Sequence, residues 1–145
     1  MEKPYEFLKV EAEEALQVLD ECIVSGYKVK DEINGEYYPN KPVDGERLTK
    51  LREKANVWAN ETIKELRKIY ASIKEQYNFR DAKTKQIIVN ADDIDYFPII
   101  GNLEARIELL NKYFDFILQH MQVKVKAKRD VYLLNAPFAK VQVKN

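Results

Sequence analysis

The chain has few of the residues on which most catalytic sites and disulfide frameworks depend. Its 145 residues include one cysteine, one histidine, four glycines and five prolines. The lone Cys22 excludes an internal disulfide and suits a reducing cytosol. The single His120 excludes any metal or acid–base site that needs two histidines of one chain. The sequence also contains no Gly-x-Gly-x-x-Gly, Walker-type or Gly-x-Ser-x-Gly motif, so common nucleotide and hydrolase motifs are absent.

Long apolar runs are also missing. No segment approaches the about 18 consecutive apolar residues of a membrane-spanning helix. The first residues, Met-Glu-Lys-Pro-Tyr-Glu, do not follow the basic-then-apolar order of a secretory signal. A chain that is 46% hydrophobic and 33% charged has the composition of a globular protein. We therefore expect a single domain over residues 1–145, located in the cytoplasm, without a membrane partner.

The zero net charge conceals an asymmetry along the chain. Residues 1–25 are mostly acidic among their charged positions, whereas residues 122–145 and the central segment 44–80 are mostly basic. Such a chain either pairs its own ends or presents an acidic and a basic surface to different partners.

Apolar spacing predicts three long helices. Residues 44–79 contain apolar side chains three or four positions apart, close to the helical period of about 3.6. A helix over about 4–24 should begin near Pro4 and stop at Ser25-Gly26, because glycine suits a helix end. A third helix should run over 103–121, capped by Asn102. The predicted fold is mainly α, a three-helix bundle.

Two further segments suggest a small β element. Asn34-Gly35 is a strong hairpin signal between alternating residues, so we expect a hairpin over 27–38. Alternating valines and lysines then predict a ribbon over 122–144. An extended basic tail over 122–145 is the alternative.

The helix at 103–121 has an unusually broad apolar arc. Leu109, Tyr113 and Phe116 widen it beyond the main core-facing positions, and Arg106 projects into it. Such a helix is either central in the domain or exposes one side to a partner. We predict a partner-binding surface formed by Leu109, Tyr113 and Phe116, with Arg106 as a polar anchor.

Basic residues support an alternative, nucleic-acid binding, through the long helix and the C-terminal segment. The candidate residues are Lys50, Lys54, Lys124, Lys126, Lys128 and Arg129. Interspersed glutamates and a pI near 6.6 differ from the strongly basic surface of most nucleic-acid-binding domains, and a solvated helix face explains the same lysines.

Acidic residues allow a third hypothesis, a metal-dependent hydrolase at Asp92, Asp93 and Asp95, whose oxygens suit magnesium or calcium. Capping of a short helical turn explains the same residues without a metal. We therefore predict no metal and no cofactor. Cys22 is expected to be a buried apolar residue, and His120 to complement a helix dipole.

The segment Leu19–Tyr27, followed by Trp58 through Leu66, Ile69 and Tyr70 and closed by Phe79, resembles the tryptophan-containing helical accessory modules of bacterial defence-type proteins. The similarity covers about residues 8–118, and the basic C-terminal segment departs from the pattern. It implies a binding role and assigns no functional residue. The expected function is thus a non-enzymatic protein–protein interaction module of a bacterial or phage protein, acting as an adaptor, inhibitor or homodimerising domain.

Overall fold

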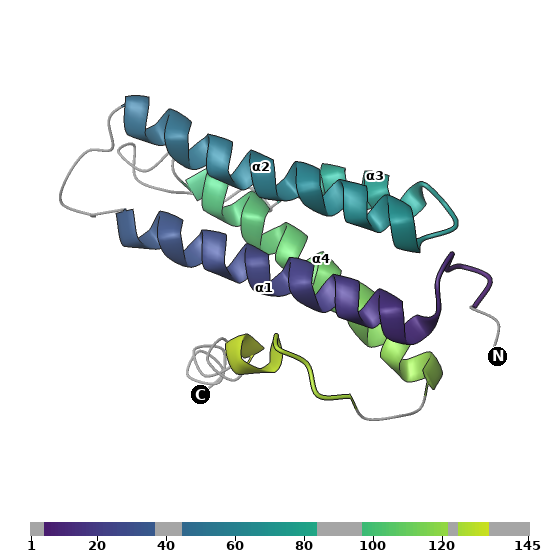
Figure 1. The fold of residues 1–145 in the computed structure, drawn as a ribbon. Coiled ribbons are helices and arrows are strands. Elements are labelled where there is room, and N and C mark those ends of the chain that lie inside the picture. The colour runs from purple at the N-terminus through teal and green to yellow at the C-terminus, as the bar shows by residue number, and fades with distance from the viewer. Residues whose placement is uncertain (1–4, 37–44, 84–96, 122–124, 134–145) are drawn as a thin grey trace.

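The protein is mainly helical. The computed structural model describes residues 5–36, 45–83, 97–121 and 125–133. It contains α1 (Ala12–Glu36), α2 (Gly45–Ile69), α3 (Lys74–Asp81) and α4 (Phe97–Met121), as shown in Figure 1. A helical turn follows at residues 130–133. The predicted fold class, mainly α, is confirmed.

The three long helices enclose one apolar core. α1 and α2 run side by side in opposite directions, and α4 crosses both (Figure 1). The most extensive contact of α4 is with α1, and the short α3 touches α2 and α4. The largest fully buried side chains come from all four helices: Leu19, Ile23, Ile33, Leu51, Leu66, Ile69, Phe79, Leu103, Leu110, Phe114 and Ile117.

The prediction that the first helix stops at Ser25-Gly26 is wrong, because α1 continues to Glu36. Gly26 allows close packing instead of ending the helix. A Cβ atom there would lie 2.6 Å from Cζ2 of Trp58 and 2.9 Å from Cγ1 of Ile107. The Trp58 indole reaches across this space and donates a hydrogen bond to the Cys22 carbonyl, 3.0 Å away. The predicted hairpin over 27–38 is therefore wrong over residues 27–36, which are helical.

The predicted continuous helix over 44–79 is interrupted between α2 and α3. The N-terminal segment, residues 5–11, crosses the chain at this point, and Leu8 forms an isolated antiparallel bridge with Tyr70. Lys9 N donates to Ile69 O (2.8 Å), and Ala71 N donates to Phe7 O (3.0 Å). These bonds satisfy backbone groups that a helix end leaves unpaired. Residues 5–11 are consequently not part of the first helix, contrary to the predicted start near Pro4.

Helix α4 begins earlier than predicted. Pro98 lies in its first turn, where its missing N–H costs no helical hydrogen bond. Asn102 is inside the helix, so the predicted cap at this residue is wrong. The additional turn buries Ile99 and Ile100, which are 8% and 7% exposed.

The predicted ribbon over 122–144 is only partly covered by the structure. Its described residues, 125–133, form an irregular stretch, a turn and the helical turn, with no strand among them. Asp92, Asp93, Asp95 and Lys124 lie outside the described residues.

Candidate functional site

Much of the broad apolar face of α4 packs inside the molecule. Tyr113 Oη donates a hydrogen bond to Glu75 O at the start of α3, 3.0 Å away, and its ring meets Tyr70 edge to face with centroids 5.5 Å apart. Burial raises the pKa of the Tyr113 hydroxyl to about 12. Tyr113 is therefore a contact between α4 and the α2–α3 connection.

Arg106 serves the other end of α3. Its Nε donates to Phe79 O (3.3 Å) and its Nη2 to Arg80 O (2.7 Å). Carbonyls in the last turn of a helix lack intrahelical partners, and a cation is favourable there. Burial lowers the pKa of the Arg106 guanidinium. The side chain thus holds α3 against α4 through neutral acceptors.

Phe116 belongs to an aromatic cluster at the C-terminal end of α4. We use the term aromatic cluster for Tyr5, Phe7, Phe116 and His120. The Phe116 ring lies 5.3 Å from Phe7 and 4.5 Å from His120, centroid to centroid. Tyr5 stacks on Phe7 at 5.6 Å. Despite these contacts, Phe116 remains 51% exposed.

The four predicted partner-binding residues therefore divide into two groups. Arg106 and Tyr113 hold α3, while Phe116 is exposed within the aromatic cluster. Leu109 is half-buried and packs against the core from the same side of α4 as Phe116. Sequence inspection missed Tyr5 and Phe7, because only the folded chain brings the N-terminal segment to the end of α4.

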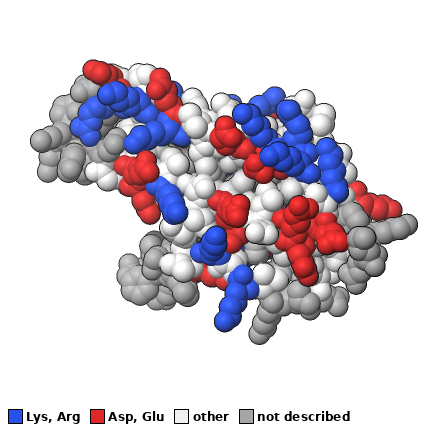
Figure 2. Space-filling model, in the orientation of Figure 1, with Lys and Arg blue, Asp and Glu red and all other residues white. Residues whose placement is uncertain are grey.

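The two lysines of the nucleic-acid hypothesis that lie on α2 are each paired with a carboxylate. Lys50 lies 3.7 Å from Glu46 and Lys54 lies 3.3 Å from Glu32. Figure 2 shows basic and acidic side chains interspersed over the visible face instead of a continuous basic surface. Lys126 and Lys128 are exposed. The hypothesis stays a prediction, with these carboxylates reducing the local positive charge.

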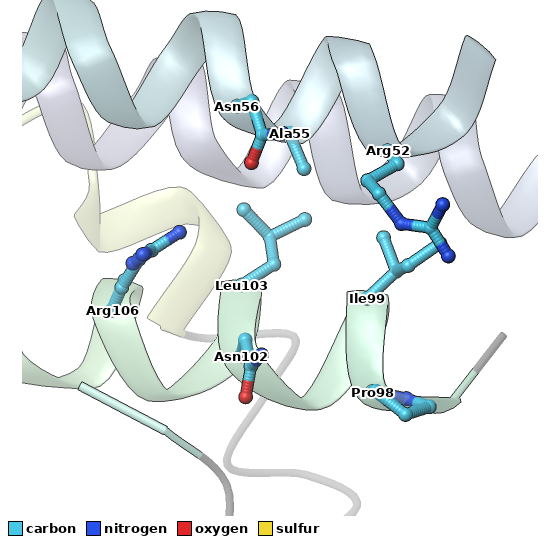
Figure 3. Close-up of a pocket in the computed structure, with 8 residues that line it drawn as sticks. All are labelled: Arg52, Ala55, Asn56, Pro98, Ile99, Asn102, Leu103 and Arg106. Carbon is cyan, nitrogen blue, oxygen red and sulfur yellow. The ribbon is translucent and has the colours of Figure 1, made fainter. Parts of the chain in front are cut away.

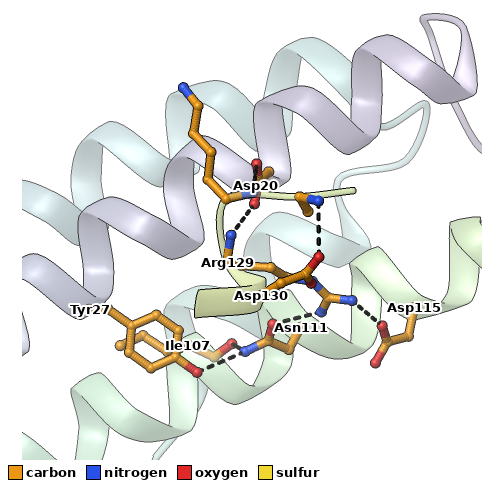
Figure 4. A network of polar contacts seen from close by, with 9 residues as sticks. Asp20, Tyr27, Ile107, Asn111, Asp115, Arg129 and Asp130 are labelled. Atoms are coloured by element: carbon orange, nitrogen blue, oxygen red, sulfur yellow. Dashed lines mark hydrogen bonds and ion pairs between the residues drawn. The ribbon is translucent and has the colours of Figure 1, made fainter. Parts of the chain in front are cut away.

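Arg129 is not part of an exposed basic surface, contrary to its place in that hypothesis. It is 5% exposed, and its guanidinium lies 3.8 Å above the centre of the Phe114 ring. Nη1 donates to Asn111 Oδ1 (2.8 Å), and Nη2 pairs with Asp115 Oδ1 (2.6 Å), as Figure 4 shows. Arg129 therefore fastens the C-terminal segment to α4.

Asp20 fastens the same segment to α1. Its two carboxylate oxygens accept the backbone N–H groups of Lys128 (2.9 Å) and Arg129 (2.8 Å). Asp20 is only 8% exposed. The sequence offers one signal for this role. Asp20 lies four residues after Leu16 and three before Ile23, and this spacing places its carboxylate beside the apolar face of the helix. Together, Asp20 and Arg129 form a buried polar clasp.

A pocket of about 280 Å³ lies between α2 and α4. Arg52, Ala55 and Asn56 line it from α2, and residues from the first turns of α4 line the other side (Figure 3). Figure 3 places Arg52 beside Ile99 and Arg106 at the opposite end, with Asn56 and Leu103 between them. Sequence inspection did not identify this site, because Arg52 and Asn56 resemble ordinary solvated helix residues until α4 is placed opposite them. The α4 residues of the lining are Pro98, Ile99, Asn102, Leu103 and Arg106.

A second pocket, of about 210 Å³, lies between α1 and α2 and contains Cys22, Glu21 and Glu65. Burial, reinforced by the charge of Glu65, raises the pKa of the Cys22 thiol to about 12. A thiol with this pKa is almost entirely protonated near neutral pH and is a poor nucleophile. Within the described ranges, no group of three or more histidine, cysteine, aspartate or glutamate side chains is arranged to hold a metal ion. Of the helices whose residues are described, none is long and apolar enough to cross a membrane.

Comparisons of the chain with protein-family models, with curated proteins and with solved structures found no match. The resemblance to helical accessory modules thus stays a prediction.

Proposed function

We propose that the three long helices act as a bundle that presents the aromatic cluster to a protein partner. In this proposal the chain is a non-enzymatic protein–protein interaction module. The observation that carries it is the 51% exposure of Phe116 beside two further aromatic rings of the N-terminal segment.

Physical chemistry favours a contact role for this cluster. Aromatic side chains are enriched at the energetic centres of protein interfaces. Burying the exposed part of such a ring is favourable by about 25 cal/mol per Å² of apolar surface. The rings also contact one another, so a partner would meet a largely preordered surface and would order few free side chains on binding.

The other predicted contact residues hold the helices together inside the molecule. Arg106 and Tyr113 fix α3 on α4, and Leu109 packs two turns before Phe116. A second copy of the chain and a different host protein are both candidate partners.

The first experiment compares Phe116→Ser with Val57→Ser. Val57 is a matched control because it is an exposed apolar residue, 62% exposed, on α2. Sedimentation velocity over a concentration series measures self-association, and affinity capture from the native host followed by a binding assay measures a different partner. Phe116→Ser should weaken the association at least about tenfold, or about 1.4 kcal/mol, whereas Val57→Ser should leave it unchanged.

Thermal unfolding of both variants by circular dichroism verifies that each is folded. The proposal is wrong if the wild-type chain stays monomeric and retains no partner that depends on Phe116. It is equally wrong if Val57→Ser weakens the association as much as Phe116→Ser.

A further inference from the structure

The described residues that line the pocket between α2 and α4 carry a net positive charge, although the chain as a whole has zero net charge. Its lining contains two guanidinium groups, from Arg52 and Arg106, and two amides, from Asn56 and Asn102. No carboxylate lines it among the described residues. The remaining lining groups are apolar, which lowers the local dielectric and strengthens the field of the two arginines.

Among the described residues, no carboxylate forms an ion pair with Arg106. Its two hydrogen bonds go to backbone carbonyls. Some of the five guanidinium N–H donors therefore remain available to a ligand. The neighbouring carboxylate, Asp81, has each of its oxygens bonded to Arg80, at 2.9 and 3.1 Å. The charge of Asp81 offsets only part of the cost of burying Arg106, whose pKa stays lowered by burial, and a bound anion would offset more of that cost.

Arg52 approaches the pocket from the opposite helix. It is exposed and forms no ion pair with a described residue, unlike its neighbours Lys50 and Lys54 on the same helix. Figure 3 shows its guanidinium beside Ile99. Ile99 and Arg106 are two turns apart on α4, or about 10 Å along the helix axis. The two cations therefore lie at the two ends of an elongated pocket and are not focused on one point.

We propose that this pocket binds a compact ligand with an anionic group at each end, a diphosphate or a dicarboxylate. Arg52 binds one anionic group and Arg106 the other, because guanidinium groups bond phosphate and carboxylate oxygens in a bidentate manner. Asn56 donates from its amide at the middle, between apolar surfaces supplied by Ala55 on α2 and by Ile99 and Leu103 on α4. The first turn of α4 contains no acidic residue, so its dipole also favours a bound anion.

The size of the pocket restricts the ligand. A volume of about 280 Å³ is slightly smaller than typical ligand pockets, which span about 300–1,000 Å³. Small bis-anions fit this volume, whereas a nucleic-acid strand does not. The inference is independent of the proposed protein contact, since it uses none of the residues of the aromatic cluster.

The experiment is calorimetric titration of the full chain with pyrophosphate and with succinate, at constant ionic strength. Inorganic phosphate and acetate are the single-anion controls. At least one two-ended probe should bind about tenfold or more tightly than its single-anion control, and the stronger probe identifies the chemical class. Arg52→Gln should remove that advantage, because a charge-assisted hydrogen bond contributes a factor of about ten or more. Arg52 is the variant of choice because Arg106 also holds α3.

Lys64→Gln is the matched control, since it makes the same change of charge on α2 outside the pocket. Its binding should equal that of the wild type. Absence of binding by both two-ended probes, or equal losses in Arg52→Gln and Lys64→Gln, would overturn the proposal. A triple variant, Asp92→Asn with Asp93→Asn and Asp95→Asn, removes three carboxylates that precede α4 in the sequence. If this variant binds the probes and the wild type does not, the proposal is overturned, because the chain's own carboxylates then compete with the probes for the two arginines.

Discussion

At the scale of single residues, two glycines of one helix have opposite roles. A Cβ atom at Gly26 would come within 2.6 Å of the Trp58 ring, whereas none of the described atoms approaches within 4 Å of a Cβ atom at Gly35. Gly26→Ala should therefore lower the free energy of unfolding by about 1–3 kcal/mol, the usual cost of overpacking. Gly35→Ala should raise it by at most about 0.5–1 kcal/mol, because alanine favours the helix but Gly35 lies in the last turn of α1.

Urea denaturation of the two variants measures this difference. The shared helix and the identical substitution make Gly35→Ala the control for helix propensity. If Gly26→Ala were as stable as Gly35→Ala, the close contact between α1 and the Trp58 ring would be incorrect.

Buried titratable groups predict a loss of stability in alkali. The pKa of Cys22 is raised from 9.0 to about 12, and that of Tyr113 from 10.0 to about 12, in both cases mainly by burial. The folded chain thus binds more protons than the unfolded chain between these values. The contribution of these two protonated groups to the free energy of unfolding is fully present below about pH 9 and is lost as the pH rises towards 12.

Urea denaturation between pH 7 and pH 11 tests this dependence. The free energy of unfolding should fall with pH above 9 in the wild type, and it should fall less steeply in Tyr113→Phe and in Cys22→Ala. The comparison uses the slope of the free energy of unfolding against pH and not its absolute value, because Tyr113→Phe also removes the hydrogen bond to Glu75 O. Equal slopes in all three proteins would contradict the assignment.

At the scale of elements, the ends of the helices are decided by segments that are distant in sequence. The apolar period of residues 44–79 predicts one helix, and most of it is helical. The interruption at residues 70–73 arises because Phe7 and Lys9 bond to the backbone of Ala71 and Ile69. Helix periodicity contains no information about this crossing.

The C-terminal segment depends on the clasp, and Arg129→Ala tests it. The change removes the bonds to Asn111 and Asp115 and the contact with the Phe114 ring. Asp115 is well exposed, with 57% of its side-chain surface accessible, so water can solvate it after the change. The expected loss of stability is about 2–3 kcal/mol, at or below the lower end of the range for breaking a buried pair.

Lys126→Ala is the control within the same segment, because Lys126 is exposed. Such a surface change should stay within about 0.5 kcal/mol. Chemical denaturation monitored by tyrosine and tryptophan fluorescence measures both variants. Equal stability of the two variants would contradict a structural role for the clasp.

At the scale of the whole molecule, the two proposed binding surfaces lie at opposite ends of α4. The aromatic cluster includes Phe116 and His120 near its C-terminal end, while the pocket uses Pro98 to Arg106 near its start. The Phe116→Ser and Arg52→Gln proteins can therefore serve as controls for each other's experiment.

One acidic residue of the N-terminal part contacts the basic C-terminal part inside the fold. Asp20, from the acidic N-terminal part, accepts the backbone N–H groups of Lys128 and Arg129 in the basic C-terminal part. The two ends therefore touch at this carboxylate, but through backbone donors and not through pairing of opposite charges, so both alternatives for the charged segments stay open. Lys128 keeps its side chain exposed, so the basic segment is not neutralised as a whole.

The sequence by itself determined the mainly helical class and most core positions, because helix periodicity is a local property of neighbouring residues. Leu51, Leu66, Leu103 and Leu110 follow that period and are buried. Only the tertiary structure decided where the helices end, why Gly26 is a glycine, and that Arg129 is buried. The same holds for the pocket, where Arg52 and Arg106 approach from helices that are distant in sequence. Each of these features depends on contacts between separate segments, and such contacts have no local periodicity from which they can be predicted.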